Sequence, residues 1–171
     1  MSTPASARAT TPTAEAPPFG AEALFGLMKV QATVVRAIDE ALMEAHETGL
    51  TGYELLSRLA NLHPDGASVR YLSDQVIVSS SRVSRVTDEF VGRGLLERAH
   101  SPHDGRLSLV RLTPAGRAEV KRMEATFAQA LEANFTGRLS RDQVVALAET
   151  AFALGAPNCA ALVESAADAD R

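Results

Sequence analysis

The chain of 171 residues has one cysteine, no tryptophan and few aromatic residues. A disulfide within the chain needs two cysteines and the common structural zinc sites need several, so a lone Cys159 excludes both. No apolar run approaches the roughly 20 residues that cross a bilayer, and the N-terminus lacks the basic and apolar blocks of a secretion signal. We therefore expect a cytoplasmic protein without a membrane partner.

An overall excess of basic charge is also missing, because the formal net charge is −4. The charge is unevenly distributed. Between Arg70 and Arg122 there are ten basic and six acidic residues (+4), which leaves seven basic and fifteen acidic residues elsewhere (−8). A basic middle segment is compatible with nucleic acid as a partner and equally compatible with a mixed, solvated surface.

The length suits one domain with helical extensions. Residues 1–20 are mostly Ser, Thr, Ala and Pro, a composition that predicts a disordered tail. The remaining pattern divides the chain into an N-terminal helix, a central domain, C-terminal helices and a C-terminal tail, with predicted bounds 21–49, 50–113, 114–157 and 158–171.

Apolar residues between Leu24 and Leu42 recur at three- and four-residue steps and predict an amphipathic helix from Glu22 to about Glu47. Thr51 and Glu54 have the spacing of a capping box and predict the start of a second helix. A short third helix is predicted to begin behind Ser68.

A fourth helix is predicted behind three consecutive serines, Ser79 to Ser81, with Val83, Val86 and Phe90 on its inner face. It is predicted to end at Gly94, because glycine readily adopts the left-handed conformation that closes many helices.

Residues 95–100 and 107–112 are predicted to be strands, and the turn-forming sequence SPHDGR between them predicts a hairpin. Thr113-Pro114 predicts the start of a long helix. A capping box of Ser140 and Gln143 predicts the start of a last helix.

The fold class predicted by this order is mostly α with a small β hairpin. It is a winged helix-turn-helix DNA-binding domain flanked by N- and C-terminal helices that serve dimerisation.

If Val83 faces inward, then Ser81, Arg82 and Arg85 face outward in the first two turns of the fourth helix, where a recognition helix meets base edges. Arginine can bond guanine O6 and N7 together, and serine at a helix N-terminus can hold a phosphate. At the hairpin tip, Arg106 could enter a minor groove with Asp104 orienting it. The alternative is that this face of the helix is an ordinary solvated surface without a binding role. The predicted DNA-binding residues are Ser79, Ser80, Ser81, Arg82, Ser84, Arg85, Asp104 and Arg106.

Two acidic residues follow on the same helix. Glu89 lies four residues from Arg85 and four from Arg93, and Asp88 is likewise expected to have a basic neighbour. At these separations opposite charges on a helix can pair, so these carboxylates need not repel phosphate.

Four fragments in order make the chain resemble the MarR family of winged helix-turn-helix transcription regulators over roughly Leu24 to Leu154. They are VSSSRVSRVTD from Val78, GLLER from Gly94, DGR from Asp104, and LTPAGR from Leu112. The resemblance implies a homodimer with intertwined terminal helices. It also implies a palindromic double-stranded DNA operator and a repressor that a small aromatic or anionic effector releases. Candidate effector-binding residues are Met28, Tyr53 and Arg58.

Self-association also has support from the residues, because the first helix and the last two carry more apolar surface than a domain of about 65 residues needs to cover itself.

Several alternatives stay open. His100 and His103 could chelate a metal in a metal-responsive regulator, although no carboxylate or cysteine set completes a site, so neither a metal site nor a cofactor is predicted. A hydrolase using His63, Asp65 and a serine lacks a nucleophile elbow and paired catalytic carboxylates, and we predict no enzyme. A winged helix that binds only proteins would not need the arginines on one surface, and its binding should hardly respond to salt.

Overall fold

The computed structural model describes residues 18, 20–76, 78–100 and 108–156. Contacts within the chain separate two compact units, Met1–Ala32 and Thr33–Arg171. Helix α1 spans Ala21–His46, close to the predicted bounds, and contributes to both units. In the described ranges, no helix combines the length and the apolarity needed to cross a bilayer.

In the first unit, large apolar side chains of α1 are exposed, among them Leu24, Leu27 and Met28. In the second unit, α1 buries Ile38 and Leu42 in the core. The predicted amphipathic helix is therefore present, and the single chain covers only its C-terminal half.

Helix α2 spans Leu50–Leu62, and the capping box predicted at its start is wrong. Its N-cap is Gly49, without a side-chain cap. Instead, the carboxylate of Asp39 on α1 accepts a hydrogen bond from the Leu50 amide at 2.7 Å. Glu54 is engaged with Arg58, one turn further on.

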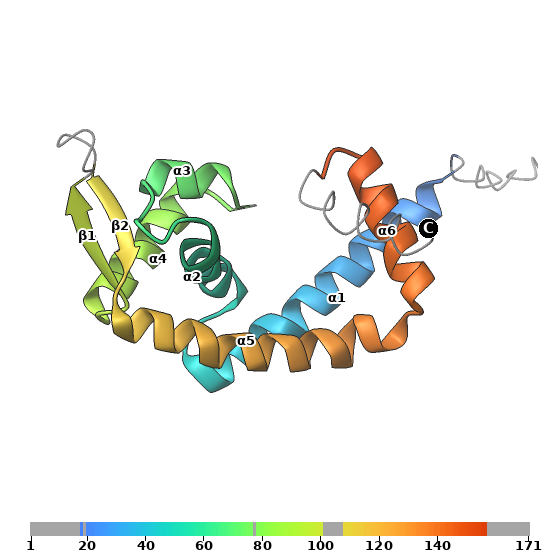
Figure 1. The fold of residues 1–171 in the computed structure, drawn as a ribbon. Coiled ribbons are helices and arrows are strands. Elements are labelled where there is room, and N and C mark those ends of the chain that lie inside the picture. The colour runs from blue at the N-terminus through green and yellow to red at the C-terminus, as the bar shows by residue number, and fades with distance from the viewer. Residues whose placement is uncertain (1–17, 19, 77, 101–107, 157–171) are drawn as a thin grey trace, which may run out of the picture. The chain divides into compact units, whose positions relative to one another are not determined.

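The helix-turn-helix consists of α3, Val69–Asp74, and α4, Ser80–Gly92 (Figure 1). The Ser68 hydroxyl accepts from the Tyr71 amide, as predicted. Ser79 is the N-cap of α4, but its hydroxyl caps no amide and instead lies 3.1 Å from the Ser81 hydroxyl. The chain leaves α4 through Gly94 at φ +72°, the conformation predicted for this glycine.

Strands β1, Leu96–His100, and β2, Ser108–Leu112, form the predicted antiparallel hairpin, with Leu96 opposite Leu112 and His100 opposite Ser108. An additional bridge that the sequence did not reveal pairs Ala67 with Val110, through hydrogen bonds of 3.0 and 2.9 Å. It ties the connection between α2 and α3 to the wing.

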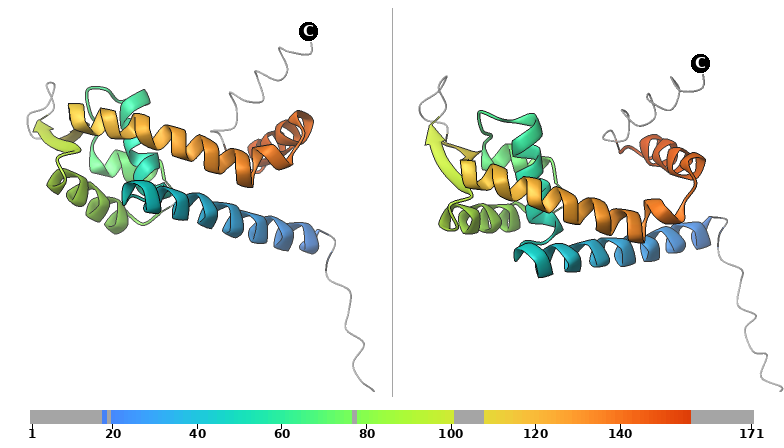
Figure 2. Two further views of the ribbon diagram at one scale, coloured as in Figure 1. Left: turned by 90° about the horizontal axis from the view of Figure 1, so that it is seen from below. Right: turned by 60° about the horizontal axis from the view of Figure 1, so that its bottom comes forward.

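Helix α5 spans Pro114–Asn134 and begins as predicted, with the Thr113 hydroxyl accepting from the Gly116 amide. Any side chain at position 116 would collide with the Leu95 carbonyl, so glycine lets α5 start directly against the hairpin, an arrangement visible in Figure 2. After the short helix η1, Thr136–Arg138, α6 spans Arg141–Ala153. Both hydrogen bonds of the capping box predicted for Ser140 and Gln143 are present.

The core of the second unit lies among the end of α1, the helices α2 to α5 and the hairpin. Its largest fully buried side chains come from all these elements and include Leu42, Leu55, Leu72, Phe90, Val110 and Met123. The predicted fold class, mostly α with a small β hairpin and terminal helices around a winged helix, is confirmed.

Candidate nucleic-acid interface

Helix α4 exposes every side chain that the sequence assigned to DNA binding on it, from Ser79 to Arg85. We call Ser81, Arg82, Ser84 and Arg85 the outer face of α4. The opposite face is anchored by Val83, Thr87 and Phe90, all fully buried. The Thr87 hydroxyl donates to the Val83 carbonyl at 2.8 Å, so the one polar side chain on the inner face is satisfied within the helix.

The two arginines of the outer face differ from three arginines at the end of α4 and on the hairpin. Arg93, Arg98 and Arg111 each form an ion pair with a carboxylate. Within the part of the chain that the structure describes, Arg82 and Arg85 form none. Their guanidinium groups keep all five donors for an external acceptor.

In the sequence, both Arg85 and Arg93 lie at pairing distance from Glu89. Of its two candidate partners, Glu89 pairs with Arg93, at 3.3 Å, and not with Arg85. Asp88 pairs with Arg98 at 2.5 Å, a residue on β1 that helix spacing could not have identified. This pair joins the hairpin to the recognition helix.

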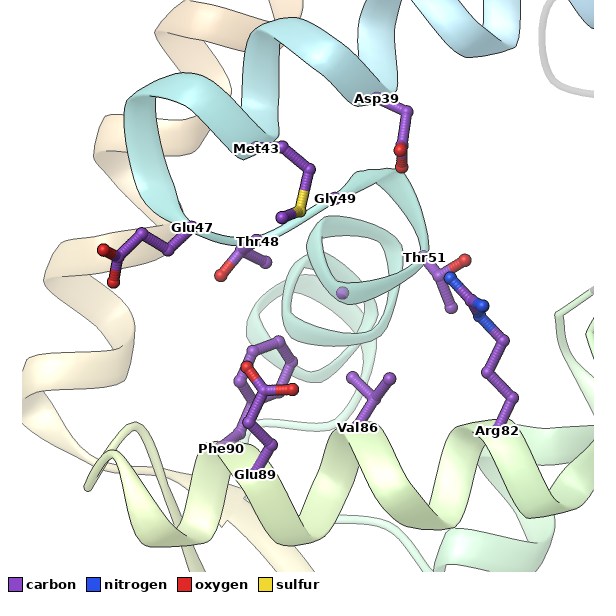
Figure 3. Close-up of a pocket in the computed structure, with 11 residues that line it drawn as sticks. Asp39, Met43, Glu47, Thr48, Gly49, Thr51, Arg82, Val86, Glu89 and Phe90 are labelled. Carbon is purple, nitrogen blue, oxygen red and sulfur yellow. The ribbon is translucent and has the colours of Figure 1, made fainter.

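Two shallow hollows adjoin the outer face. One, of about 330 Å³, is lined by Arg82, Arg85, Val86 and Glu89. The other, of about 190 Å³, lies between α1, α2 and α4. Figure 3 shows the side chain of Arg82 reaching from α4 toward Thr51 on α2. Arg82 therefore stands at the edge of α4, while Arg85 lies on its outward side.

The predicted wing residues Asp104 and Arg106, like His103, lie outside the described residues, as does Cys159. The described part of the wing comprises the two strands in their antiparallel register, with Arg98 in the middle of β1 paired to Asp88. The hairpin is thus linked to the C-terminal half of α4.

None of the candidate effector residues is among those that line the two hollows. Tyr53 stacks on Phe127 of α5, with ring centroids 4.6 Å apart, and burial raises the pKa of its hydroxyl above the ordinary value. Arg58 is half-buried and bonds to Glu54 at 2.9 Å. Met28 belongs to the first unit and is exposed. The assignment of these residues to an effector stays a prediction.

A part-buried polar cluster, which was not predicted from the sequence, joins the end of α1 to α5. His46 Nδ1 lies 2.9 Å from Glu119 Oε1, and His46 Nε2 lies 2.9 Å from Thr126 Oγ1. Arg122 also donates to Glu119. Burial alone would raise the pKa of Glu119, but the hydrogen bonds from Arg122 and His46 outweigh burial and lower it. Glu119 is thus held as a carboxylate between two nitrogen donors.

Among the described residues, no group of three or more His, Cys, Asp or Glu side chains is placed to hold a metal ion. His63 and Asp65, named above for the hydrolase alternative, lie in the connection after α2, where the His63 ring meets Tyr71 edge-on at 4.9 Å.

Residues 46–107 match the sequence model of the MarR family. The matched segment runs from the end of α1 through α4 and β1 to the hairpin tip. Over this segment the chain is similar to the MarR family. The match does not include α5, α6 or α1 before its last residue.

A curated relative of this MarR-family segment is the HTH-type transcriptional regulator YdgJ of Bacillus subtilis, which is 35% identical over 68 residues. These residues are 40% of this chain and 40% of the relative, so the chain matches well under half of the relative's length.

Solved structures share the fold beyond the MarR-family segment. That of Sco3205, a MarR family regulator from Streptomyces coelicolor in complex with DNA, has a TM-score of 0.73 at 20% identity and covers 83% of this chain and 91% of its own. That of CouR from Rhodococcus jostii, bound to p-coumaroyl-CoA, has a TM-score of 0.70 at 22% identity, covering 81% of this chain and 94% of its own. The terminal helices therefore complete a MarR-like fold.

Proposed function

We propose that the chain is a sequence-specific transcription regulator that binds duplex DNA as a homodimer. The observation that carries the proposal is the outer face of α4. It combines a run of exposed serines with two arginines that form no ion pair among the described residues, and the Asp88–Arg98 pair links α4 to the hairpin.

Each part of this surface has a role in the proposal. Arg85 reads a base edge in the major groove, where a bidentate pair with guanine discriminates by about 1–3 kcal/mol. Because the Ser79 hydroxyl bonds to no amide of α4, the first amides of the helix and the serine hydroxyls can bond a phosphate. Arg82, at the edge of α4, contacts the backbone beside it.

The wing completes each half-site. In the proposal, Arg106 enters the minor groove and Asp104 orients its guanidinium. A dimer presents α4 and the wing twice, so the site is a palindrome with half-sites about one helical turn apart.

The dimer is proposed to form through the terminal helices. The exposed apolar side chains of the chain are concentrated there, and water-exposed patches of this kind are typical of interaction sites. They include Leu24, Phe25, Leu27, Met28 and Val30 on α1 and Phe152 on α6.

The proposal extends to regulation by a small molecule. CouR is bound to p-coumaroyl-CoA, which supports an aromatic or anionic effector here as well, with repression relieved when it binds. Met28, Tyr53 and Arg58 remain its candidate residues. Such a regulator acts in the cytoplasm and needs no catalytic activity of its own.

Selection of bound duplexes from a random pool tests the proposal. A DNA regulator enriches a palindrome, and its affinity for that duplex falls steeply between about 50 and 200 mM salt. An adaptor that binds only proteins enriches no sequence, and that result would overturn the proposal. The selection is then repeated with phenolic compounds or with metal ions. Loss of enrichment with one of these additives would identify which kind of effector releases the DNA.

A further inference from the structure

Arg93, at the C-terminal end of α4, bonds to residues at the end of α1. Its Nη1 donates to the Glu47 carbonyl at 3.2 Å and to the Thr48 hydroxyl at 2.8 Å. Its Nη2 donates to the His46 carbonyl at 3.1 Å. We call these contacts the Arg93 joint.

The end of α1 needs such a donor. The last carbonyls of a helix have no partner within it, and a cation there also meets the negative end of the helix dipole. Glu47 follows α1 at φ +52°, a left-handed position usually held by glycine. The guanidinium bonds the carbonyl of Glu47 and that of the preceding residue, His46, so it stabilises the left-handed backbone that ends α1.

The other side of the guanidinium is held by α4 itself. Glu89 Oε1 accepts from Nη1 at 3.3 Å, and the Arg93 Cζ lies 5.7 Å from the centroid of the Phe90 ring. Phe90 is fully buried, and the Arg93 side chain is 29% exposed. Figure 3 shows Glu47 and Thr48 on one side of this region and Glu89 and Phe90 on the other.

We propose that Arg93 is a positioning residue for operator recognition, which sets the angle of the recognition helix against α1 and so the half-site spacing that the dimer accepts. This inference rests on the proposed function. In it, α1 belongs to the dimer interface and α4 to the groove, so a joint between them fixes the distance between the two recognition helices.

The geometry of DNA makes this consequence measurable. Moving one half-site by one base pair shifts it by about 3.4 Å along the axis and also rotates it. A rigid joint tolerates such a shift poorly, whereas a loosened joint lets α4 follow the displaced groove.

The experiment measures affinity for the selected palindrome and for versions with one base pair added or removed between the half-sites. Loss of charge-assisted hydrogen bonds is expected to lower the preference of Arg93→Ala for the original spacing by about tenfold. Its affinity for a scrambled duplex should equal that of the original chain. Arg93→Lys keeps the charge without the forked donors and should fall between the two.

Arg138→Ala is the matched control. Arg138 also donates to the carbonyl of a helix end, that of Ala133 at 3.1 Å, but it follows α5 and not α4. The control removes the same charge and the same kind of cap, and it should keep the original spacing preference. Arg93→Gln, which retains the aliphatic stem, repeats the test if the alanine variant folds poorly.

A second measurement needs no DNA. Amide hydrogen exchange in Arg93→Ala should become faster at the end of α1 and in the last turn of α4, compared with the original chain. If the original chain bound no duplex, the proposed function would fail while this comparison still decided the joint. An unchanged spacing preference, equal losses on selected and scrambled duplexes, or unchanged exchange would each overturn the inference.

Discussion

Single arginines on this surface have different surroundings, and those surroundings decide what each can do. Arg85 is exposed on the outer face of α4 and forms no ion pair within the ranges that the structure describes, whereas Arg98, half-exposed, is engaged with Asp88. A guanidinium already bonded to a carboxylate must exchange that partner before it can bond a base. Arg85 has no described carboxylate partner to exchange before it bonds a base.

Arg85→Ala should therefore reduce discrimination between the selected and a scrambled duplex by about 1–3 kcal/mol per half-site. Fluorescence anisotropy titrations on both duplexes provide the measurement. Arg141→Ala, which removes an exposed arginine from the first turn of α6, is the control for charge. Equal effects of the two variants would remove Arg85 from base recognition.

The lowered pKa of Glu119 predicts how the free energy of unfolding depends on pH. Because its pKa is lowered in the folded chain, the carboxylate stabilises the fold above its unfolded value near 4.5, and the contribution is lost as the pH falls through the folded value. Glu119→Gln should lower the free energy of unfolding at pH 7 by about 1–3 kcal/mol. The difference should shrink in steps from pH 5 to pH 3, as measured by urea unfolding. A difference that stays constant over this range would contradict the assigned charge.

At this scale, helix periodicity was sufficient to place the outer face of α4, because Val83 and Phe90 define the buried side. The partners of Arg93 and Arg98 could not be predicted in the same way. Both arginines bond to groups on other elements, and sequence separation carries no information about those contacts. The same is true of His46 and Glu119, 73 residues apart.

At the scale of elements, the position of the wing depends on a close approach of two backbones. Gly66 has φ +104°, and a Cβ at this position would lie 2.9 Å from the Val110 carbonyl. The neighbouring Ala67–Val110 bridge can form because no side chain intervenes.

Gly66→Ala is accordingly expected to destabilise the fold by about 1–3 kcal/mol, through the unfavourable φ and the displaced strand. Gly92→Ala offers a matched control, since φ is ordinary there and a methyl group would meet nothing within 4 Å. That variant should be neutral or more stable by up to about 1 kcal/mol. Thermal unfolding of both compares them, and equal stabilities would show that the wing does not need this approach.

Element bounds followed from the sequence wherever the signal was local. Ser140 caps α6 as predicted, because a hydroxyl and an amide three residues later suffice, and α5 begins at the predicted Thr113-Pro114. The start of α2 was mispredicted because the acceptor for its first amide is Asp39, on another helix. A distant carboxylate replaced the local cap.

Among the residues that the structure describes, the exposed large apolar side chains lie mostly on α1 and at the end of α6, and few lie in the winged helix. Leu24 and Leu27 on α1 are 56% and 47% exposed. The fold predicted from sequence was correct, but a single chain leaves the partner of this surface outside the structure.

We expect the full chain to sediment as a dimer. Replacing Leu24 and Leu27 by glutamine should raise the dimer dissociation constant at least about tenfold, since burying a leucine contributes about 1.5–3 kcal/mol. Ala118→Gln, an exposed position on α5, should leave it unchanged. Sedimentation equilibrium over a range of concentrations makes the comparison, and a stable dimer in the double variant would place the interface elsewhere.

Hydrogen exchange of the full chain with and without its selected duplex tests the central claim most directly. The account predicts slowed amide exchange from Ser79 through Arg85, where the helix enters the groove, and unchanged exchange along the middle of α5. Protection confined to other elements, with α4 exchanging as in the free chain, would contradict it.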